Sequence, residues 1–301
     1  TWFANWDRSM FVRVEEQPDS ISEYVMMDEK GPGAIVRFWM TFTGPDCGQG
    51  TLKIYIDGNE TPAIEGKAFD ILSGGQLVGA PLSTSVSEKT AYEMRGHNLY
   101  FPIPYAKSCK VTYKTKNIKT FGAKQGDDES VYYNINFRTY PEGTDVVSFT
   151  PEALEAAKAK VESINKTLDS KDRGLEGLTL TRYDLPKTID AGASETVTID
   201  AGKTAIRHFS MTMPEGDHSA IMRQLIVEMA FDGERTVWVP AGDFFGTGYK
   251  LCEVNNWYGT VSLDGAMNSY WVMPFKKNCK ITFHNLSDKD ITLADAYVQT
   301  A

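Results

Sequence analysis

The chain lacks any long apolar segment. No run of about 18 apolar residues occurs among its 301 residues, so a membrane-spanning helix is not expected. Basic residues are also outnumbered, because 31 Lys and Arg stand against 40 Asp and Glu. The resulting net charge of −9 makes the chain a poor partner for nucleic acid or an anionic membrane. Hydrophobic residues still make up 42% and aromatic residues 12%, which excludes an intrinsically disordered chain.

Metal-ligating and motif-bearing residues are scarce as well. The chain has four cysteines, four histidines and no CxxC pair, so a zinc site of the usual spacing is not expected. P-loop, dinucleotide-binding and nucleophile-elbow motifs are absent. We therefore expect no cofactor, although a structural calcium ion stays open because β-sandwich loops bind one without a readable motif. The pairing state of the cysteines also stays open, since cores of this size do not require disulfides.

An internal repeat organises the chain. Residues 34–41 (AIVRFWMT) match residues 205–212 (AIRHFSMT) at five of eight positions, with an offset of 205 − 34 = 171. Asp57-Gly58 matches Asp232-Gly233, Asp70 matches Asp243, and residues 100–112 match residues 270–282, with offsets of 175, 173 and 170. Four matches in one order indicate a tandem duplication. We place the two modules at residues 1–147 and 176–301.

Hydrophobic periodicity predicts that each module is built of β-strands. Residues 53–57 (KIYID), 109–113 (CKVTY), 133–137 (YNINF) and 279–283 (CKITF) alternate polar and apolar side chains. Such runs indicate half-buried antiparallel strands, and the two Asp-Gly pairs are typical of tight turns. The predicted fold class is all-β, with two tandem jelly-roll β-sandwich modules joined by one α-helix. Core and cross-strand packing is the favoured role of the tyrosine-rich strands.

A single helix is predicted in the linker, residues 148–175. Thr150 has the character of an N-cap, Pro151 suits the first helical position and Glu152 suits the first turn. Apolar residues then recur at helical spacing over about 18 residues, at Leu154, Ala157, Val161, Ile164 and Leu168. We expect this helix to pack at the junction of the two modules.

Aromatic and charged residues near the N-terminus form a first candidate sugar site. Trp6 stands beside Asp7 and Arg8 in the sequence. Indole rings stack on the C–H faces of sugars, and charged groups bind sugar hydroxyls. The alternative is a terminal strand with buried aromatics and a surface ion pair.

A second candidate site lies in residues 243–257. This segment combines glycine turns with the acids Asp243 and Glu253, the amide Asn255 and the indole Trp257. Glycoside hydrolysis needs a pair of carboxyl groups, which lie about 5–5.5 Å apart in retaining enzymes. We predict Asp243 and Glu253 as the catalytic pair. The alternative is that Asp243 caps a turn and that Glu253 is a solvent-exposed surface group.

The ordered motifs resemble a known family. The chain is similar to domain-of-unknown-function family 2961, also classed as glycoside hydrolase family 172. The residues that carry the resemblance are Asp7-Arg8, 31–41 (GPGAIVRFWMT), 54–58 (IYIDG), 100–104 (YFPIP) and 132–137 (YYNINF). The resemblance implies two jelly rolls per chain, a homotrimer or hexamer, and retaining cleavage of α-linked fructofuranosides or arabinofuranosides. It also implies two catalytic Glu residues in a site shared between protomers.

The chain departs from that family at one motif. Enzymes of the family carry a Gly-Thr-Glu-Asp-Tyr-Phe-like stretch in the second module, whereas residues 240–249 here read PAGDFFGTGY. Asp243 is retained but the preceding Glu is missing, so Glu253 is our substitute. Asp7 and Arg8 match the N-terminal pattern of the family, and the resemblance implies that they contact the sugar.

Three functions remain open at this point. The first is an exported bacterial furanosidase, which is periplasmic, cell-surface or extracellular. Export is favoured because the sequence starts at Thr1 with no basic or apolar leader, as in a mature chain. The second function is non-catalytic carbohydrate binding, which the missing Glu motivates. The third is a structural double jelly-roll protein.

Overall fold

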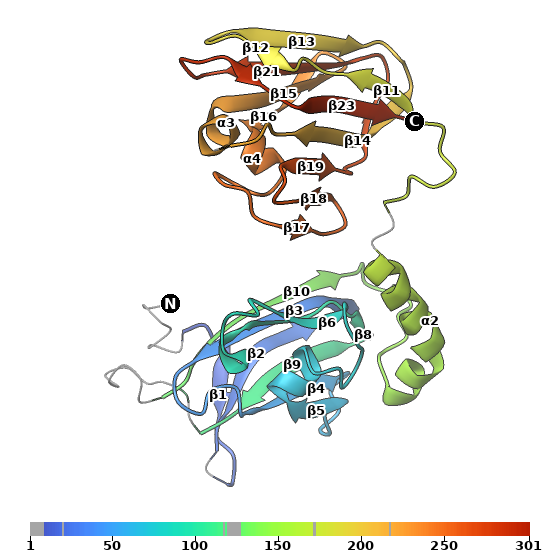
Figure 1. The fold of residues 1–301 in the computed structure, drawn as a ribbon. Helices are drawn as coiled ribbons and strands as arrows, with labels where there is room; N and C mark the ends of the chain where they lie inside the picture. Colours follow the sequence, from blue (N-terminus) through green and yellow to red (C-terminus); the bar gives the residue numbers. More distant parts are fainter. Residues whose placement is uncertain (1–8, 20, 117, 119–127, 171–172, 217) are drawn as a thin grey trace. The chain divides into compact units, whose positions relative to one another are not determined.

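The computed structural model describes residues 9–301, except for residues 20, 117, 119–127, 171–172 and 217. The chain divides into two compact units, Thr1–Asp169 (unit 1) and Ser170–Ala301 (unit 2), and each is described by itself. Antiparallel sheets dominate both units (Figure 1). Within the described part of the chain, every helix is too short or too polar to span a membrane.

Unit 1 contains two antiparallel sheets. The first has the order β1 (Arg13–Glu15), β2 (Glu23–Lys30), β9 (Ser108–Lys114), β4 (Thr51–Ile56) and β5 (Ile64–Lys67). The second has the order β10 (Ser130–Thr139), β3 (Gly33–Thr43), β7 (Gly96–Leu99) and β6 (Ser83–Val86), and β8 (Ile103–Tyr105) also pairs with β3. The short helices α1 (Ala68–Leu72) and η2 (Tyr92–Met94) connect strands, and α2 (Pro151–Ser170) follows the last strand.

The core of unit 1 lies between the two sheets. In β4, Leu52, Ile54 and Ile56 are buried, whereas the alternate residues Lys53 and Tyr55 point to the other face of the sheet. The inner faces of the other strands add further aliphatic and aromatic side chains to the same cluster. The alternation of buried and outward-facing residues predicted from the sequence is therefore the alternation expected for strands of a β-sandwich.

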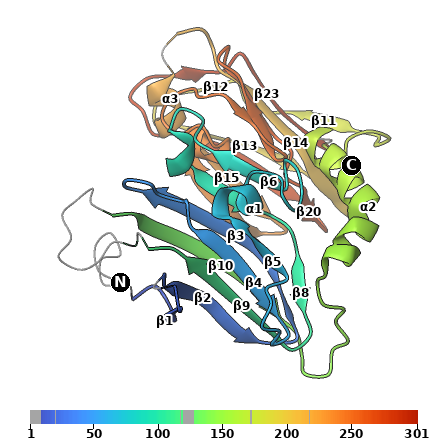
Figure 2. The same ribbon diagram turned by 90° about the horizontal axis from the view of Figure 1, so that it is seen from below.

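Helix α2 packs on unit 1. The hydroxyl of Thr150 accepts a hydrogen bond of 3.1 Å from the backbone N–H of Ala153, which confirms the predicted N-cap. Leu154 and Val161 pack against the core of unit 1, and the side chain of Asn165 donates to the carbonyl of Gly79. Both views show the helix beside β8 (Figures 1 and 2). The apolar face of the helix is thus partly buried against its own unit.

Unit 2 contains a long sheet, a four-stranded sheet and a short strand pair. The long sheet has the order β11 (Thr181–Asp184), β23 (Asp295–Thr300), β14 (Thr204–Thr212), β19 (Ala266–Ser269), β18 (Gly259–Val261) and β17 (Val254–Asn255), and β20 (Met273–Phe275) pairs with β14. The second sheet has the order β13 (Ser194–Ile199), β21 (Cys279–Asn285), β15 (Leu225–Phe231) and β16 (Glu234–Pro240). The pair is β12 (Thr188–Ile189) with β22 (Ile291–Thr292), and the helices are α3 (Ser219–Gln224) and α4 (Ala241–Phe244).

The strand orders of the two units correspond. The order β10-β3-β7-β6 in unit 1 matches β23-β14-β19-β18 in unit 2, and β2-β9-β4-β5 matches β13-β21-β15-β16. β8 pairs with β3 as β20 pairs with β14, and α1 corresponds to α4. The predicted all-β fold of two tandem jelly-roll sandwiches with one long helix is confirmed.

The repeated Asp-Gly pairs build the same turn in both units. Asp57 and Asp232 have positive φ angles of 58° and 53°, and a glycine with positive φ follows each of them. The carboxylate of Asp57 accepts from the backbone N–H of Lys107 at 2.6 Å, and that of Asp232 accepts from the N–H of Lys277 at 2.6 Å. These acids therefore anchor a neighbouring loop, which explains their recurrence without any role in binding.

The four cysteines are unpaired. Cys47, Cys109 and Cys279 are buried, and Cys252 is exposed. Burial raises the pKa of the corresponding pair Cys109 and Cys279 to about 12, so both stay protonated and act as small apolar residues.

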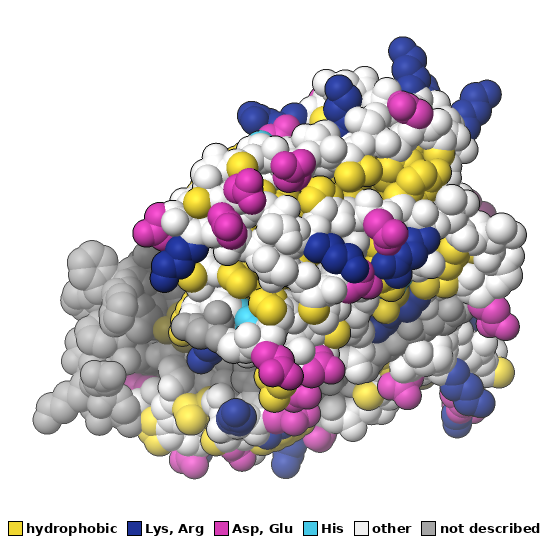
Figure 3. All heavy atoms as spheres, turned by 45° about the horizontal axis from the view of Figure 1, so that its top comes forward, with side chains coloured by type: hydrophobic (Ala, Val, Ile, Leu, Met, Phe, Trp, Pro, Cys, Tyr) yellow, Lys and Arg dark blue, Asp and Glu magenta, His cyan; other side chains and the backbone are white. Residues whose placement is uncertain are grey.

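The charges are mixed on the surface drawn in Figure 3. Asp and Glu side chains alternate there with Lys and Arg side chains and with small hydrophobic patches. The net charge of −9 is therefore not gathered into one acidic field on this face.

Candidate active site

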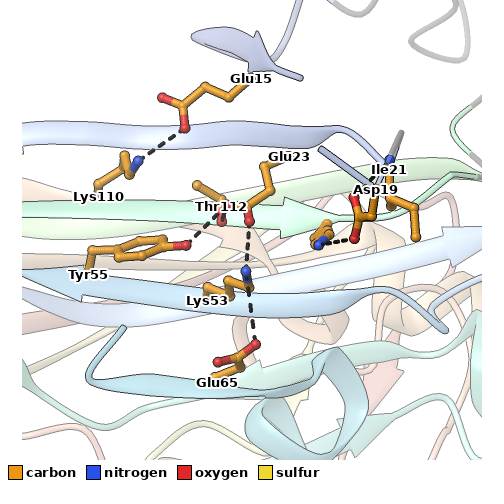
Figure 4. Close-up of polar contacts among 10 residues, drawn as sticks. Glu15, Asp19, Ile21, Glu23, Lys53, Tyr55, Glu65, Lys110 and Thr112 are labelled. Atoms are coloured by element: carbon orange, nitrogen blue, oxygen red, sulfur yellow. Dashed lines mark hydrogen bonds and ion pairs between the residues drawn. The ribbon is translucent and has the colours of Figure 1, made fainter. Parts of the chain in front are cut away.

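One carboxylate-rich cavity lies on the outer face of the first sheet of unit 1. It measures about 570 Å³, and its lining includes Glu15, Glu23, Asp28, Lys53 and Lys110. Figure 4 shows Glu15, Glu23, Lys53 and Lys110, which pair with one another across neighbouring strands. A glycosidase needs a carboxyl pair, so this cavity is a candidate active site alongside residues 243–257.

Glu23 of β2 is the most buried acid of this cavity. It is 3% exposed and lies 2.7 Å from Nζ of Lys53 on β4 (Figure 4). The hydroxyls of Tyr55 and Thr112 also donate to its carboxylate, at 3.2 and 2.9 Å. Burial raises the pKa of Glu23, but the hydrogen bonds from Lys53 and Thr112 and the charge of Lys53 outweigh it, so the net pKa is lowered.

The neighbouring acids are neutralised in the same way. Glu15 pairs with Arg13 at 2.6 Å and with Lys110 at 3.1 Å, and Arg13 also reaches Asp28 at 2.6 Å. Burial raises the pKa of Glu15, yet the hydrogen bonds from Arg13 and Lys110 bring it below its usual value. A general acid for glycosides needs a raised pKa, so these paired carboxylates are suited to hold strands together rather than to donate protons.

Glu129 is the acid with the opposite shift. It is 1% exposed, and it accepts hydrogen bonds from the N–H of Gly48 at 2.8 Å, the hydroxyl of Thr115 at 2.8 Å and the hydroxyl of Tyr113 at 3.1 Å. Burial raises its pKa, and these hydrogen bonds offset only part of the rise. Because Glu129 lies inside the core, it connects the loop of Gly48 to β9 through hydrogen bonds and is not accessible to a substrate.

The raised pKa of Glu129 gives a testable pH dependence. A carboxyl group with a raised folded-state pKa contributes stability below its unfolded pKa of about 4.3, and this contribution is lost as the pH rises through the folded pKa. Glu129→Gln keeps an acceptor oxygen and removes the titration. As the pH rises above about 4.3, we expect the free energy of unfolding in urea to fall more for the wild type than for the variant. An identical pH dependence of the two proteins would contradict the raised pKa.

In unit 2, Asp243 lines a small cavity beside α4. The helix starts directly after β16, and Gly242 fits there because a Cβ at this position would lie 1.8 Å from the carbonyl oxygen of Gly248. The cavity measures about 170 Å³. The Asp243 carboxylate is 39% exposed and lies 2.5 Å from Nη1 of Arg223 on α3. The residue predicted from the sequence thus faces open space and is not merely a turn cap.

Two stacked aromatic rings form another wall of this cavity. The rings of Tyr258 and Trp271 lie 4.2 Å apart at an angle of 11°, and each residue is about half exposed. The side-chain oxygen of Asn256 accepts from the backbone N–H of Tyr258 at 2.9 Å, which holds the loop before β18. Asn268 of β19 completes the polar lining. An acid, amides and an exposed aromatic pair are the groups that sugar recognition uses.

The other predicted site residues of unit 2 lie outside this cavity lining. Glu253 is exposed on the segment between α4 and β17, and no hydrogen bond or ion pair joins its carboxylate to other described residues. Asn255 on β17 accepts from Arg173 at 3.3 Å. Trp257 is partly buried. The predictions for Trp6, Asp7 and Arg8 fall outside the described residues.

Tyr258 and Trp271 were not predicted as site residues from the sequence. They are 13 positions apart (271 − 258). The pairing of β18 with β19 brings them together, and the N–H of Tyr270 donates to the carbonyl of Tyr258 at 2.8 Å. A hairpin prediction for residues 258–271 would have been the only signal. Among the described residues, no cluster of three or more His, Cys, Asp or Glu side chains is arranged to hold a metal ion.

These features define a double β-sandwich protein with a candidate saccharide cavity. Comparison with known families agrees with the β-sandwich fold. The family model "GH172 first beta-sandwich domain" matches residues 1–157, and "GH172 domain-like" matches residues 181–298. The chain therefore belongs to glycoside hydrolase family 172. No curated protein matches the sequence.

Solved structures resemble the chain only distantly. The major capsid protein P2 of bacteriophage PM2 is 9% identical, with a TM-score of 0.26 over 97% of this chain and 94% of that protein. The CBM32-1 and CBM32-2 domains of Clostridium perfringens ZmpB are 10% identical, with a TM-score of 0.20 over 96% and 84% of the two chains. A serine protease–chaperone complex from Aeromonas sobria is 7% identical, with a TM-score of 0.22. That match covers 41% of this chain and spans only 26% of the other.

Proposed function

We propose that the protein is a retaining glycoside hydrolase that cleaves α-linked furanosides, such as fructofuranosides or arabinofuranosides, at the cavity beside α4. Membership of glycoside hydrolase family 172 supports the reaction class. The observation that carries the location is that one cavity is lined by both the Asp243 carboxylate and the stacked rings of Tyr258 and Trp271. The family resemblance further supports a trimer or hexamer as the working form.

In this proposal Asp243 is the nucleophile. Its carboxylate attacks the anomeric carbon as the bond to the leaving-group oxygen breaks, and a covalent glycosyl-enzyme ester forms. Arg223 holds one carboxylate oxygen, at 2.5 Å, which fixes the direction of the other. The rings of Tyr258 and Trp271 offer an apolar surface to the sugar, and the amide nitrogen of Asn256 is available for a hydroxyl group.

Glu253 is the proposed acid/base. It would protonate the leaving-group oxygen in the first step and take a proton from water in the second, when water cleaves the ester and releases the sugar. Glu253 lies on the exposed segment that leads from α4 to β17. A retaining mechanism requires this segment to bring the two carboxyl groups to about 5–5.5 Å when the sugar binds.

One observation favours non-catalytic carbohydrate binding as the second candidate. Asp243 is the only carboxylate among the described residues that line the cavity, and Arg223 already holds it. A binding site needs no second acid, whereas a retaining hydrolase does.

Glu253→Gln tests the proposal with aryl α-furanosides. We expect the wild type to release the aryl group, and the variant to be slower by about 10²- to 10⁴-fold because it has lost general acid–base catalysis. Added azide should restore turnover of the variant and yield an α-furanosyl azide, since azide attacks the glycosyl-enzyme without needing a base. The exposed Glu234→Gln on β16 is the control and should keep full activity.

The outcomes separate the candidates. Full activity of Glu253→Gln would reject Glu253 as the acid/base. Failure of the wild type on every aryl furanoside, together with binding to immobilised furanose glycans, would select the non-catalytic function.

A further inference from the structure

The outer face of β10, β3 and β7 in unit 1 carries an aromatic and polar cluster that the proposed active site does not use. Arg37 and Trp39 alternate on β3 with the fully buried Phe38 and Met40, so they point away from the core. The strand register places Trp39 beside Asn134 of β10 and Asn98 of β7. β10 and β3 lie side by side in both ribbon views (Figures 1 and 2).

Arg37 is held in place without being neutralised. Its Nη1 donates to the side-chain oxygens of Asn134 and Asn136, both at 3.2 Å, and its Nη2 lies 3.5 Å from the side-chain oxygen of Asn98. Its guanidinium also lies 5.6 Å from the ring centre of Tyr100. All these partners are uncharged, and no carboxylate among the described residues pairs with Arg37. The cation is therefore fixed and unpaired, which favours a ligand carboxylate.

The amides next to Arg37 have free donors. Because the oxygens of Asn134 and Asn136 accept from Arg37, their NH₂ groups are left to donate, and neither has a partner among the described residues. Both asparagines are exposed. Amide donors beside an indole match the hydroxyl groups and the C–H face of a sugar ring.

On the corresponding face of unit 2, the polar groups are paired with neighbouring side chains of the same unit. His208 replaces Arg37, and Ser210 replaces the indole of Trp39. The two ring nitrogens of His208 pair with Gln299 at 2.8 Å and with Asn268 at 2.9 Å, and its ring stacks on Tyr270 at 4.9 Å. The duplication thus supplies an internal reference in which Arg37 and the indole of Trp39 are both replaced, although Arg173 lies 5.1 Å from the ring centre of Tyr270 there.

We propose that this face of unit 1 binds saccharide chains that contain hexuronate. The sugar carboxylate would pair with Arg37, the ring would stack on Trp39, and the amides of Asn134 and Asn136 would bind hydroxyl groups. The site lies in unit 1 and does not depend on hydrolysis in unit 2. It would hold an acidic glycan chain as a binding module.

Calorimetric titration of the full chain tests this proposal. The probes are tetragalacturonate, tetramannuronate and their methyl esters, which keep the sugar rings and remove the charge. We expect at least one acid to bind about tenfold or more tightly than its ester at low salt. This preference should shrink as salt screens the pair. Arg37→Gln should remove the preference, and Trp39→Phe should weaken acid and ester alike.

One control and one further site variant keep the result interpretable. Ser210→Ala changes the position in unit 2 that corresponds to Trp39, and it should leave binding unchanged. Asn136→Ala alters an exposed side chain and should weaken binding without affecting thermal unfolding. The proposal is overturned if no acidic tetrasaccharide binds, if acid and ester bind equally, or if Arg37→Gln binds as the wild type does.

Discussion

Asp243→Asn is expected to lower the turnover of an aryl α-furanoside by about 10³-fold or more, because an amide cannot act as the nucleophile that forms the glycosyl-enzyme ester. The substitution keeps the size of the side chain and leaves the cavity beside α4 in place. Binding of the sugar should change much less than turnover, since Tyr258 and Trp271 remain. Measured kcat and KM for the purified variant separate these two effects.

The tandem repeat provides a matched control for this variant. Asp70 occupies the position in α1 that corresponds to Asp243 in α4, and it is also an exposed residue of a short helix. Asp70→Asn should keep the activity of the wild type. Equal losses in the two variants, or none in Asp243→Asn, would remove Asp243 from the active site.

Lys53→Met is expected to destabilise unit 1 by about 3 kcal/mol, because it leaves the carboxylate of Glu23 buried without its cation. Glu23 is 3% exposed and Lys53 is 14% exposed, so water compensates little for the lost pair. The lowered pKa of Glu23 contributes stability above its unfolded pKa of about 4.3, and this contribution is lost as the pH falls through the folded pKa. The variant should therefore lose stability at neutral pH and differ less from the wild type in acid.

Hydrogen exchange of the amides in β2, β4 and β9 measures this loss in unit 1 alone. Lys114→Met breaks a pair with Asp19 of similar length, 2.6 Å, but Asp19 is 49% exposed. This control substitution should lower the free energy of unfolding by about 1 kcal/mol or less. The double variant Glu23→Gln with Lys53→Met should recover part of the loss. Equal effects of Lys53→Met and Lys114→Met would show that burial of Glu23 does not matter.

The fold could be predicted from the sequence because its signals are local and repeated. The alternation in residues 53–57 reports the two faces of β4, and the pair at Asp57 recurs at Asp232 because both units need the same anchored turn. Thr150 and Pro151 indicate the start of α2 in the sequence, and the predicted N-cap forms there in the structure. Each of these features depends on residues close together in the chain.

The sites could be predicted only in part because they depend on strand register. Asp243 was predicted because its segment is rich in acids and turns, and the structure places it in the lining of a cavity. Tyr258 and Trp271 meet only through the β18–β19 pairing, and Glu23 meets Lys53 only across β9. No local pattern in the sequence reports such neighbours.

The central claim is that the chemistry occurs at the cavity beside α4, with Asp243 as the nucleophile. Its most direct test is the reaction of the full chain with an α-furanose-configured epoxide, followed by peptide mass spectrometry to locate the sugar. A nucleophile opens the epoxide and keeps the sugar as an ester, so we predict one label per chain on Asp243 and none in Asp243→Asn. A label on a unit 1 carboxylate such as Glu23 or Glu15, or undiminished labelling of Asp243→Asn, would contradict the account.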